Sequence, residues 1–321
     1  MKEIQVKVLQ ITMSLVRKLM PVRKKNSNKK DFGHVLILAG SKNMAGAPVL
    51  CANAAIRFGA GLVSVGVPEV IRDIVVKKTR SEVMVRGFNA NINDGTFGLK
   101  AFKEIKKFII ERKIDAIAIG PGISVNSSTI ALVVKILQTF KGFIVLDADA
   151  LNCIAKSKYD LSSSNAKIVI TPHEGEFSRL SGLSLKNISS RRCQSACEFA
   201  NKNKVVCVLK GSATVVSDGN KIFINTTGNP GMATAGCGDV LTGMIVAALC
   251  QITQPIMASV FAVYIHGLAG DIAAKDNTQI GMVASDISGR LPLALKRIVG
   301  YKMLPLTSIL SLEGRGSPKG R

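Results

Sequence analysis

The chain has 321 residues, of which 47% are hydrophobic, enough to bury a core in one large domain or two small ones. Its seven cysteines are odd in number and lack the paired spacing of zinc ligands, which argues against a disulfide framework and predicts a cytoplasmic protein. The net charge of +22 is concentrated at the ends, since residues 1–30 contribute +8 and residues 296–321 contribute +5. With 5% aromatic residues and no tryptophan there is little for bases to stack on, so nucleic-acid binding is excluded as a main function.

Apolar runs that end at a glycine, a proline or an acid recur along the chain. The runs are continuous rather than alternating, as expected for strands buried on both faces of a parallel sheet. Strands are predicted at residues 34–39, 62–67, 116–119, 143–146, 167–170 and 205–209. Helices are predicted between them at residues 46–58, 99–112, 127–140 and 190–203. This alternation predicts a three-layer α/β domain with a mostly parallel sheet and right-handed crossovers.

The rest of the chain is predicted to add one hairpin and then helices only. The hairpin joins residues 213–216 to residues 221–224 across Asp218-Gly219. The helices cover residues 239–251, 256–274 and 285–298. The apolar run in the second of these helices stops at Asp271, short of the ~20 residues that a membrane span needs, so no membrane association is expected.

The two ends are expected to lie outside this domain. Residues 1–14 are predicted to form a short N-terminal extension, and residues 15–300 a single domain. Residues 301–321 are polar, basic and rich in glycine, which predicts a disordered C-terminal tail.

The segment Asn229–Asp239 carries the strongest functional signal. Its small residues, among them Gly236 and Gly238, let backbone N–H groups crowd together, and an apolar helix begins at once. The free N–H groups and the positive end of the helix dipole then face the loop, which makes an anion hole suited to a phosphate. Asp239 stands at its mouth, where a carboxylate can take a proton from a hydroxyl that attacks the phosphate.

The alternative for any glycine-rich loop is a tight turn or close helix packing. The coincidence of loop, helix start and acid favours the phosphate site here. The segment is not a Walker A motif, because no Lys-Ser/Thr follows the last glycine. It is not a dinucleotide-binding fingerprint either, because it does not follow the first strand.

Several further candidates follow predicted strands, at the edge where open α/β sheets bind ligands. Gly46-Ala47 permits a close approach of a ligand to the backbone, although helix packing explains it equally well. Gly120-Pro-Gly122 is predicted to form a turn, whether or not a ligand binds beside it. Asp147 and Asp149 could hold Mg²⁺ through water or cap the next helix; capping is favoured for Asp149, and both roles stay open for Asp147.

Three more motifs contain polar or titratable groups. His173 follows a strand and is predicted to contact a ligand, whereas Glu176 is predicted to interact with a helix dipole. Residues 210–214, which begin with Lys210, offer a cation and hydroxyl groups to the sugar and phosphates of a nucleotide. His266 falls in an apolar helix and is predicted to be a core histidine.

Taken together, these motifs resemble the ADP-dependent NAD(P)H-hydrate dehydratases of the ribokinase-like superfamily. The resemblance runs from about Leu19 to Ile298. The motifs that carry it are Lys30-Asp-Phe-Gly33, Leu38-Ala-Gly-Ser41 with Gly46-Ala47, Gly59-Ala-Gly61-Leu62-Val63, Gly120-Pro-Gly122, Leu146-Asp-Ala-Asp-Ala-Leu-Asn152, Thr171-Pro-His-Glu-Gly-Glu-Phe177, Lys210-Gly-Ser-Ala-Thr214, Asn229–Asp239 and Tyr264-Ile-His-Gly267.

The resemblance implies a repair reaction on hydrated NADH and NADPH. A nucleotide phosphorylates the C6 hydroxyl of the S epimer, phosphate departs, and loss of the C5 proton restores the double bond. The implied co-substrate is ADP, which leaves as AMP, with Mg²⁺ as cofactor held mainly by the nucleotide phosphates. Thr214 resembles the ADP-using branch, because ATP-using relatives tend to have aspartate at this position.

The resemblance also implies roles for individual residues. Asp239 would be the catalytic base, and Gly236, Cys237 and Gly238 would form the anion hole. The hydrated dinucleotide would contact Ala47, Gly122, His173 and Asp239. The adenine nucleotide would contact Lys210, Gly211, Ser212, Ala213, Thr214 and Gly238.

The alternative interpretation is a ribokinase-like kinase of a small alcohol, of the hydroxyethylthiazole or pyridoxal type, which would release a phosphorylated product. The family further implies a homo-oligomer, expected to be a tetramer. Many relatives carry an N-terminal epimerase domain for which this chain has no room, so a functional link to a separate epimerase is expected.

Overall fold

The structure is a computed structural model that describes residues 7–300. Its sheet has ten strands in the order β1-β10-β9-β8-β7-β6-β5-β2-β3-β4. Neighbouring strands run parallel except at the two borders of β9. The strands are Val8–Gln10 (β1), His34–Leu38 (β2), Leu62–Pro68 (β3), Met84–Phe88 (β4), Ala116–Ile119 (β5), Phe143–Leu146 (β6), Lys167–Ile170 (β7), Val206–Leu209 (β8), Val215–Ser217 (β9) and Ile222–Ile224 (β10). The six predicted strands and the hairpin are all present, whereas β1 and β4 were not predicted.

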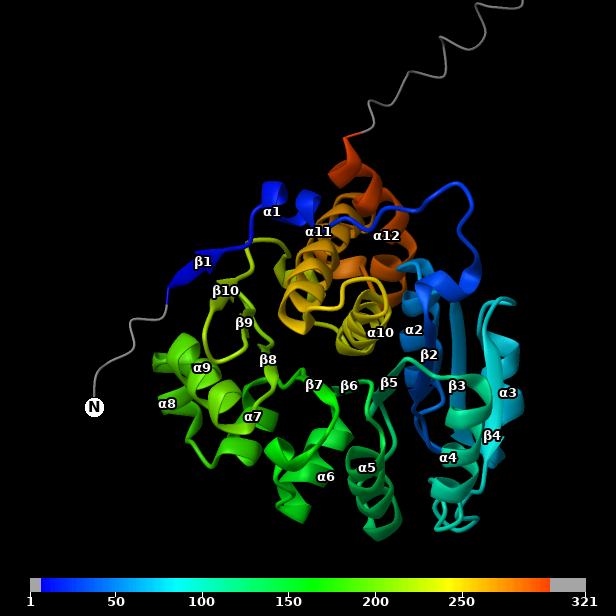
Figure 1. Cartoon of the computed structure of the whole chain (residues 1–321). Helices are drawn as coiled ribbons and strands as arrows, with labels where there is room; N and C mark the ends of the chain where they lie inside the picture. Colours follow the sequence, from blue (N-terminus) through cyan, green and yellow to red (C-terminus); the bar gives the residue numbers. More distant parts are fainter. Residues whose placement is uncertain (1–6, 301–321) are drawn as a thin grey trace, which may run out of the picture.

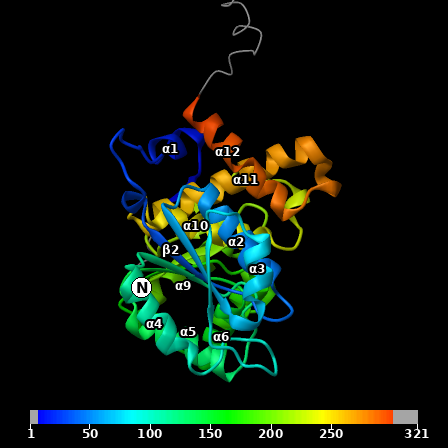
Figure 2. The same cartoon turned by 90° about the vertical axis from the view of Figure 1, so that its right-hand side faces the viewer.

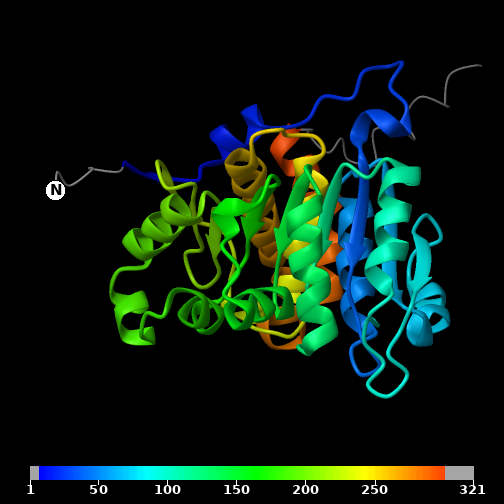
Figure 3. The same ribbon diagram turned by 60° about the horizontal axis from the view of Figure 1, so that its bottom comes forward.

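Helices cover both faces of the sheet and complete the predicted three-layer α/β fold (Figures 1 and 2). The first layer contains Gly46–Arg57 (α2), Arg72–Lys78 (α3), Cys237–Leu249 (α10), Pro255–Gly281 (α11) and Ala284–Val299 (α12). The second layer, at the front of Figure 3, contains Ala101–Arg112 (α4), Ser127–Thr139 (α5), Asp149–Ser157 (α6), Glu174–Ser181 (α7), Leu185–Ser190 (α8) and Arg192–Asn203 (α9).

Two hydrophobic cores lie on the two sides of the sheet, and β2 contributes to both. Val35 and Ile37 pack in the core under the first layer, while Leu36 and Leu38 pack in the core under the second. Successive side chains of a strand point to opposite faces, so a strand between two helical layers must be apolar at every position. This is the physical reason for the continuous apolar runs in the sequence.

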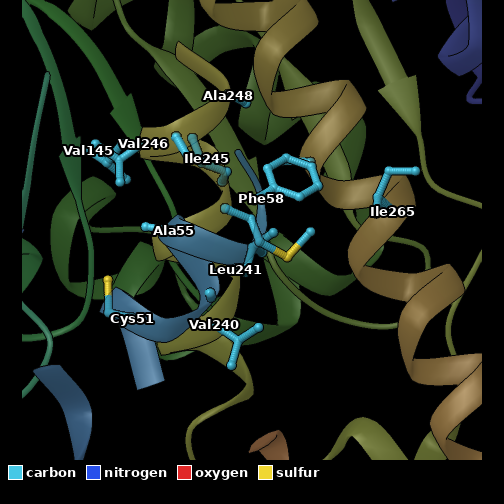
Figure 4. Packing of buried hydrophobic residues seen from close by; sticks show 14 of the residues in the cluster. Cys51, Ala55, Phe58, Val145, Val240, Leu241, Ile245, Val246, Ala248 and Ile265 are labelled. Atoms are coloured by element: carbon cyan, nitrogen blue, oxygen red, sulfur yellow. The ribbon is translucent and has the colours of Figure 1, made fainter. Parts of the chain in front are cut away.

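Close packing of α10 against α2 fixes the position of the Asn229–Asp239 loop. Figure 4 shows Cys51 and Ala55 of α2 beside Val240 and Leu241 of α10. At Gly243 a Cβ atom would overlap the carbonyl oxygen of Cys51, so only glycine allows this contact. The packing of α10 against α2 therefore fixes where the first turn of α10 lies.

The long apolar helix α11 extends past its predicted end and runs from Pro255 to Gly281, with a non-helical residue at Thr278. By length and composition it is the one helix of the described residues that could cross a membrane, but 83% of its most apolar window is buried inside the protein. Such burial is typical of a core helix, and α11 packs against α10 and α12.

Part of the expected N-terminal extension belongs to the fold. Residues 8–10 form β1, which pairs in parallel with β10 at the edge of the sheet. Thr12 then caps a short helix, Met13–Lys18 (α1), by accepting a hydrogen bond from the backbone N–H of Leu15 at 3.3 Å. The predicted C-terminal tail, 301–321, lies outside the described residues.

Candidate active site

The N-terminus of α10 is open toward the loop that precedes it. Gly236 stands before the helix with a φ of 89°, a left-handed conformation that favours glycine, and no side chain caps the helix end. N–H groups in the first turn of a helix have no acceptor within that helix. The N–H of Cys237, one of the three groups of the predicted anion hole, donates instead to the carbonyl oxygen of Thr234 at 3.5 Å. The N–H groups of Gly238 and Asp239 are available to an anion, at the positive end of the helix dipole.

Asp239 lies in this first turn and is partly buried. Burial, together with the negative charge of Asp147, raises the pKa of its carboxyl group to about 7, against the opposing effect of the Lys210 ammonium. A carboxyl group that titrates near neutrality can accept a proton and release it again at physiological pH. The position and the environment of Asp239 both suit a general base.

A buried ion pair lies behind the anion loop. The Nζ atom of Lys210 is 2.7 Å from Oδ1 of Asp147, and Asp147 is 1% exposed. Burial works against the charged ammonium, but the carboxylates of Asp147 and Glu176 outweigh it and raise the pKa of Lys210. A Cβ atom at Gly238 would be 3.3 Å from this Nζ atom, so the ammonium lies directly beneath the anion loop.

His173 lies at the start of α7 and is its N-cap residue. Its Nδ1 atom accepts a hydrogen bond from the N–H of Gly175 at 3.0 Å, and Glu176 accepts one from the N–H of His173 at 2.9 Å. The side chain of His173 is 55% exposed, and its other ring nitrogen, Nε2, lies 3.4 Å from Oε1 of Glu176. Glu176 lies in the first turn of α7, as predicted, and also 3.9 Å from the ammonium of Lys210.

A cavity of about 700 Å³ lies between the anion loop, the 210–214 loop and α11. Among the predicted site residues, its lining includes His173, Lys210, Gly211, Ser212, Ala213, Thr214, Cys237 and Gly238. The structure thus places every residue of the predicted nucleotide subsite on one cavity of a size suited to a nucleotide. Their individual roles remain predictions.

Ala47, Gly122, Gly236 and Asp239 are not part of the cavity lining. Gly122 has a φ of 65°, and a Cβ atom there would lie 3.3 Å from the Cβ atom of Ala47, so these two predicted dinucleotide contacts adjoin each other. On its other side the anion loop packs against α2, the helix that carries Ala47, since a Cβ atom at Gly236 would overlap the side chain of Leu50. The anion loop therefore lies between two predicted subsites.

The backbone of the 210–214 loop is held from below by Arg192. This side chain donates hydrogen bonds to the carbonyl oxygens of Leu209, at 3.2 Å, and Lys210, at 3.3 Å. Arg192 also forms an ion pair with Glu174 of α7. Residues far apart in the sequence therefore fix the start of the predicted nucleotide subsite.

Sequence reasoning missed one wall of the cavity, made of Asn225, Thr227 and Gly228 and the facing side of α11. Asp271 of α11 holds this loop by accepting hydrogen bonds from the N–H of Gly228 and the side chain of Asn229, both at 3.0 Å. His266 is buried as predicted, and burial lowers its pKa to about 4, so it is neutral and donates from Nε2 to the carbonyl oxygen of Cys237 at 3.1 Å. It also lines the cavity, which the apolar sequence around it gave no reason to expect.

Replacing Gly267 with alanine is expected to weaken nucleotide binding. A Cβ atom at this position would overlap the hydroxyl group of Thr227 and lie 2.7 Å from its carbonyl oxygen, so the cavity wall has to move outward. Calorimetric titration with ADP measures the change in affinity. Gly289→Ala on α12 is the matched control, because no atom lies within 4 Å of the new methyl group and ADP binding should not change.

The predicted capping role of Asp149 is wrong. The residue before α6 is Ala148, and Asp149 is the first residue of the helix itself. Its carboxylate accepts a hydrogen bond from the N–H of Ser124 at 2.9 Å, because the turn after β5 passes over this helix end. Asp147 does not cap the helix either, since its oxygen atoms are used by the ion pair and by hydroxyl groups. Within residues 7–300 no group of three or more His, Cys, Asp or Glu side chains is placed to hold a metal ion.

Comparison with known sequences identifies relatives along most of the chain. A family model described as NAD(P)H-hydrate dehydratase matches residues 35–293. The bifunctional NAD(P)H-hydrate repair enzyme of Moorella thermoacetica is 38% identical over 290 residues, which are 90% of this chain and 54% of the relative. This chain thus spans about half the length of the bifunctional relatives. The ADP-dependent (S)-NAD(P)H-hydrate dehydratase of Bacillus subtilis is 33% identical over 284 residues, 88% of this chain and 96% of the relative.

Solved structures of the same kind of enzyme also resemble this chain. The ADP/ATP-dependent NAD(P)H-hydrate dehydratase from Bacillus subtilis, co-crystallised with ATP and Mg²⁺, superimposes with a TM-score of 0.80 at 32% identity, over 92% of this chain and 99% of that one. A hydroxyethylthiazole kinase from Pyrococcus horikoshii reaches a TM-score of 0.58 at 17% identity, which shows a common ribokinase-like fold alone. The family match and the full-length relative together establish that the chain belongs to the NAD(P)H-hydrate dehydratase family.

Proposed function

We propose that this chain catalyses the ADP-dependent dehydration of the S epimer of hydrated NADH and NADPH. The observation that carries the proposal is the position of the first turn of α10, which holds Asp239 beside free N–H groups: Gly238 lines the nucleotide-sized cavity, and Gly236 packs against α2, the helix of Ala47. A base at this point can reach a hydroxyl group on one side while a phosphoryl group enters from the other. Membership of the family supports the choice of substrate.

In the proposed mechanism, Asp239 removes the proton of the C6 hydroxyl as its oxygen attacks the β-phosphorus of ADP. The bond to AMP breaks, and the N–H groups of Gly238 and Asp239 stabilise the charge on the transferring phosphoryl group. The ammonium of Lys210, beneath the same loop, adds a positive charge at short range. The C6–O bond then breaks with the electron pair leaving on phosphate, the ring nitrogen supplies its lone pair, and loss of the C5 proton restores NADH or NADPH.

Mg²⁺ belongs to this proposal as a companion of the nucleotide. The residues that line the cavity include no carboxylate, so this chain offers the ion no direct acidic ligand there. Such a lining fits a cation that arrives bound to phosphate oxygens and retains water ligands, as Mg²⁺ prefers. When bound, the ion neutralises phosphate charge, while Lys210 and the helix N-terminus orient the phosphates. The co-crystallisation of the Bacillus subtilis relative with ATP and Mg²⁺ supports this assignment.

The rate of the reaction is expected to fall as the pH is lowered through about 7. The raised pKa of Asp239 means that its carboxyl group is ionised above this pH and protonated below it, and only the ionised form can accept a proton. Measurement of kcat between about pH 5 and pH 9 should therefore give an acid limb with a midpoint near 7. A flat profile down to about pH 5 would remove Asp239 from the role of base.

Product analysis separates the dehydratase from the small-alcohol kinase that the fold also allows. Phosphorus NMR of a mixture of protein, hydrated NADH, Mg²⁺ and ADP should show AMP and inorganic phosphate in equal amounts. Consumption of nucleotide in the presence of hydroxyethylthiazole or pyridoxal, with a stable phosphate ester, would favour the kinase. If the protein is a dehydratase, the phosphoryl group transferred from ADP should be found only in inorganic phosphate.

The proposal extends to the location, the oligomeric state and a functional partner of the enzyme. A cytoplasmic location is consistent with seven free cysteines, none of which forms a disulfide within the described residues. We expect a homotetramer, to be tested by light scattering. The bifunctional repair enzymes among the relatives support a functional link to an epimerase that interconverts the two hydrated forms.

A further inference from the structure

Asp147, at the end of β6, is the most highly connected carboxylate in the interior. Its Oδ1 atom accepts hydrogen bonds from Lys210 at 2.7 Å and from the hydroxyl of Thr171 at 2.8 Å. Its Oδ2 atom accepts one from the hydroxyl of Thr242 at 2.7 Å. With 1% exposure and no place in the cavity lining, Asp147 is shielded from solvent and lies behind the residues that face the ligand.

The three partners come from three elements that meet beneath the anion loop. Thr171 follows β7, Lys210 follows β8, and Thr242 lies on α10, one turn after Asp239. A Cβ atom at Gly238 would be 3.3 Å from Nζ of Lys210 and 3.9 Å from Oδ2 of Asp147. Asp147 therefore connects the floor of the loop to the helix that carries the base.

A role limited to packing would not require a carboxylate at this position. An apolar side chain fills buried space without the desolvation of a charge, and replacing buried ion pairs by apolar groups is often neutral or stabilising. The carboxylate here also raises the pKa of Asp239, a second acid, and so opposes the ionisation of that residue. A buried charge kept against these costs points to a contribution to the reaction.

We propose that Asp147 is a positioning residue, which holds the Lys210 ammonium beneath the anion loop and the first turn of α10 in place for phosphoryl transfer. This inference rests on the proposed function and adds a residue that does not touch the substrates. The groups around Asp239 support the proposal. Asp147 raises the pKa of Asp239 and Lys210 lowers it. The other titratable neighbours, the thiols of Cys51 on α2 and Cys237 on α10, are neutral.

Asp147→Asn tests the proposal, because it removes the charge and keeps the size. We expect kcat to fall about tenfold, as for coupled members of one hydrogen-bond network, while the KM for hydrated NADH changes little. The acid limb of the pH profile should move to lower pH, since a negative charge beside Asp239 is lost. This shift tests the electrostatic contact between the two acids, and the fall in kcat at unchanged KM separates a positioning role from packing alone. Asp160→Asn, at an exposed loop outside the site, is the matched control and should leave kcat and the limb unchanged.

A second variant and a second readout keep the outcomes distinct. If Asp147→Asn does not fold, Thr242→Val removes one contact to Asp147 and should lower kcat, and Thr242→Ser should restore it. Carbon-13 NMR of the Asp239 carboxyl group follows its titration without turnover, so it tests the electrostatic link even if the wild-type protein shows no dehydratase activity. A wild-type protein that is active, with variants that keep the same kcat and the same titration of Asp239, would overturn the role of Asp147 and leave the proposed function intact.

Discussion

Asp239→Asn is expected to lower kcat by about 10²- to 10⁴-fold, the usual contribution of a general base. Asparagine has nearly the shape of aspartate but cannot accept the proton of the C6 hydroxyl. The N–H groups at the start of α10 stay in place, so ADP should bind with nearly unchanged affinity. Stopped assays of NADH recovery and calorimetric titration with ADP measure the two quantities separately.

The same variant should be at least as stable as the wild-type protein. The pKa of Asp239 is raised from 3.8 to about 7, so its ionised form opposes folding and the protein loses stability as the pH rises across this range. Replacing it with neutral asparagine removes this effect at about pH 8. Thermal unfolding should show an equal or higher Tm, whereas retention of most of the activity would contradict the role of Asp239.

Lys210→Ala is expected to lower the free energy of unfolding by about 3–5 kcal/mol. The reason is that Asp147 stays buried with two hydroxyl partners and without its cation. The KM for the nucleotide should rise more than the KM for the hydrated cofactor, because Lys210 lines the nucleotide-sized cavity. Urea unfolding and steady-state kinetics measure the two effects. A larger rise in the KM for the hydrated cofactor would mean that the two subsites are interchanged.

The double variant Lys210→Ala/Asp147→Asn is the control for this explanation. Removing both charges should recover part of the stability that the single Lys210→Ala substitution loses, because no unpaired carboxylate is left in the interior. If the double variant is as unstable as the sum of the two single variants, the ion pair does not account for the loss.

The central strands could be predicted because they are buried on both faces and are therefore apolar throughout. The two strands that were missed lie at the two edges of the sheet, where burial is incomplete. In β1, two of three residues are exposed, and β4 contains Arg86 and Gly87 among its five residues. Neither has the length or the apolar pattern that marks an inner strand.

The anion loop could be predicted because its parts are adjacent in the sequence. The support beneath it could not, since Asp147 and Lys210 are 63 residues apart and meet only because β6, β7 and β8 are neighbours in the sheet. The charge balance around Asp239 depends on the same folding. Likewise, the sequence of α11 indicates only a core helix. It does not show that Asp271 binds the loop that forms the cavity wall, or that Gly267 packs closely against this loop.

The most direct test of the account is the recovery of the near-ultraviolet absorbance of reduced nicotinamide. The purified protein is mixed with the S epimer of hydrated NADH and Mg²⁺, with ADP, with ATP or without nucleotide. A dehydratase should give a rise in absorbance that requires nucleotide, occurs with ADP, and is accompanied by AMP and phosphate. No rise with either nucleotide, from a folded protein that binds ADP, would contradict the dehydratase assignment.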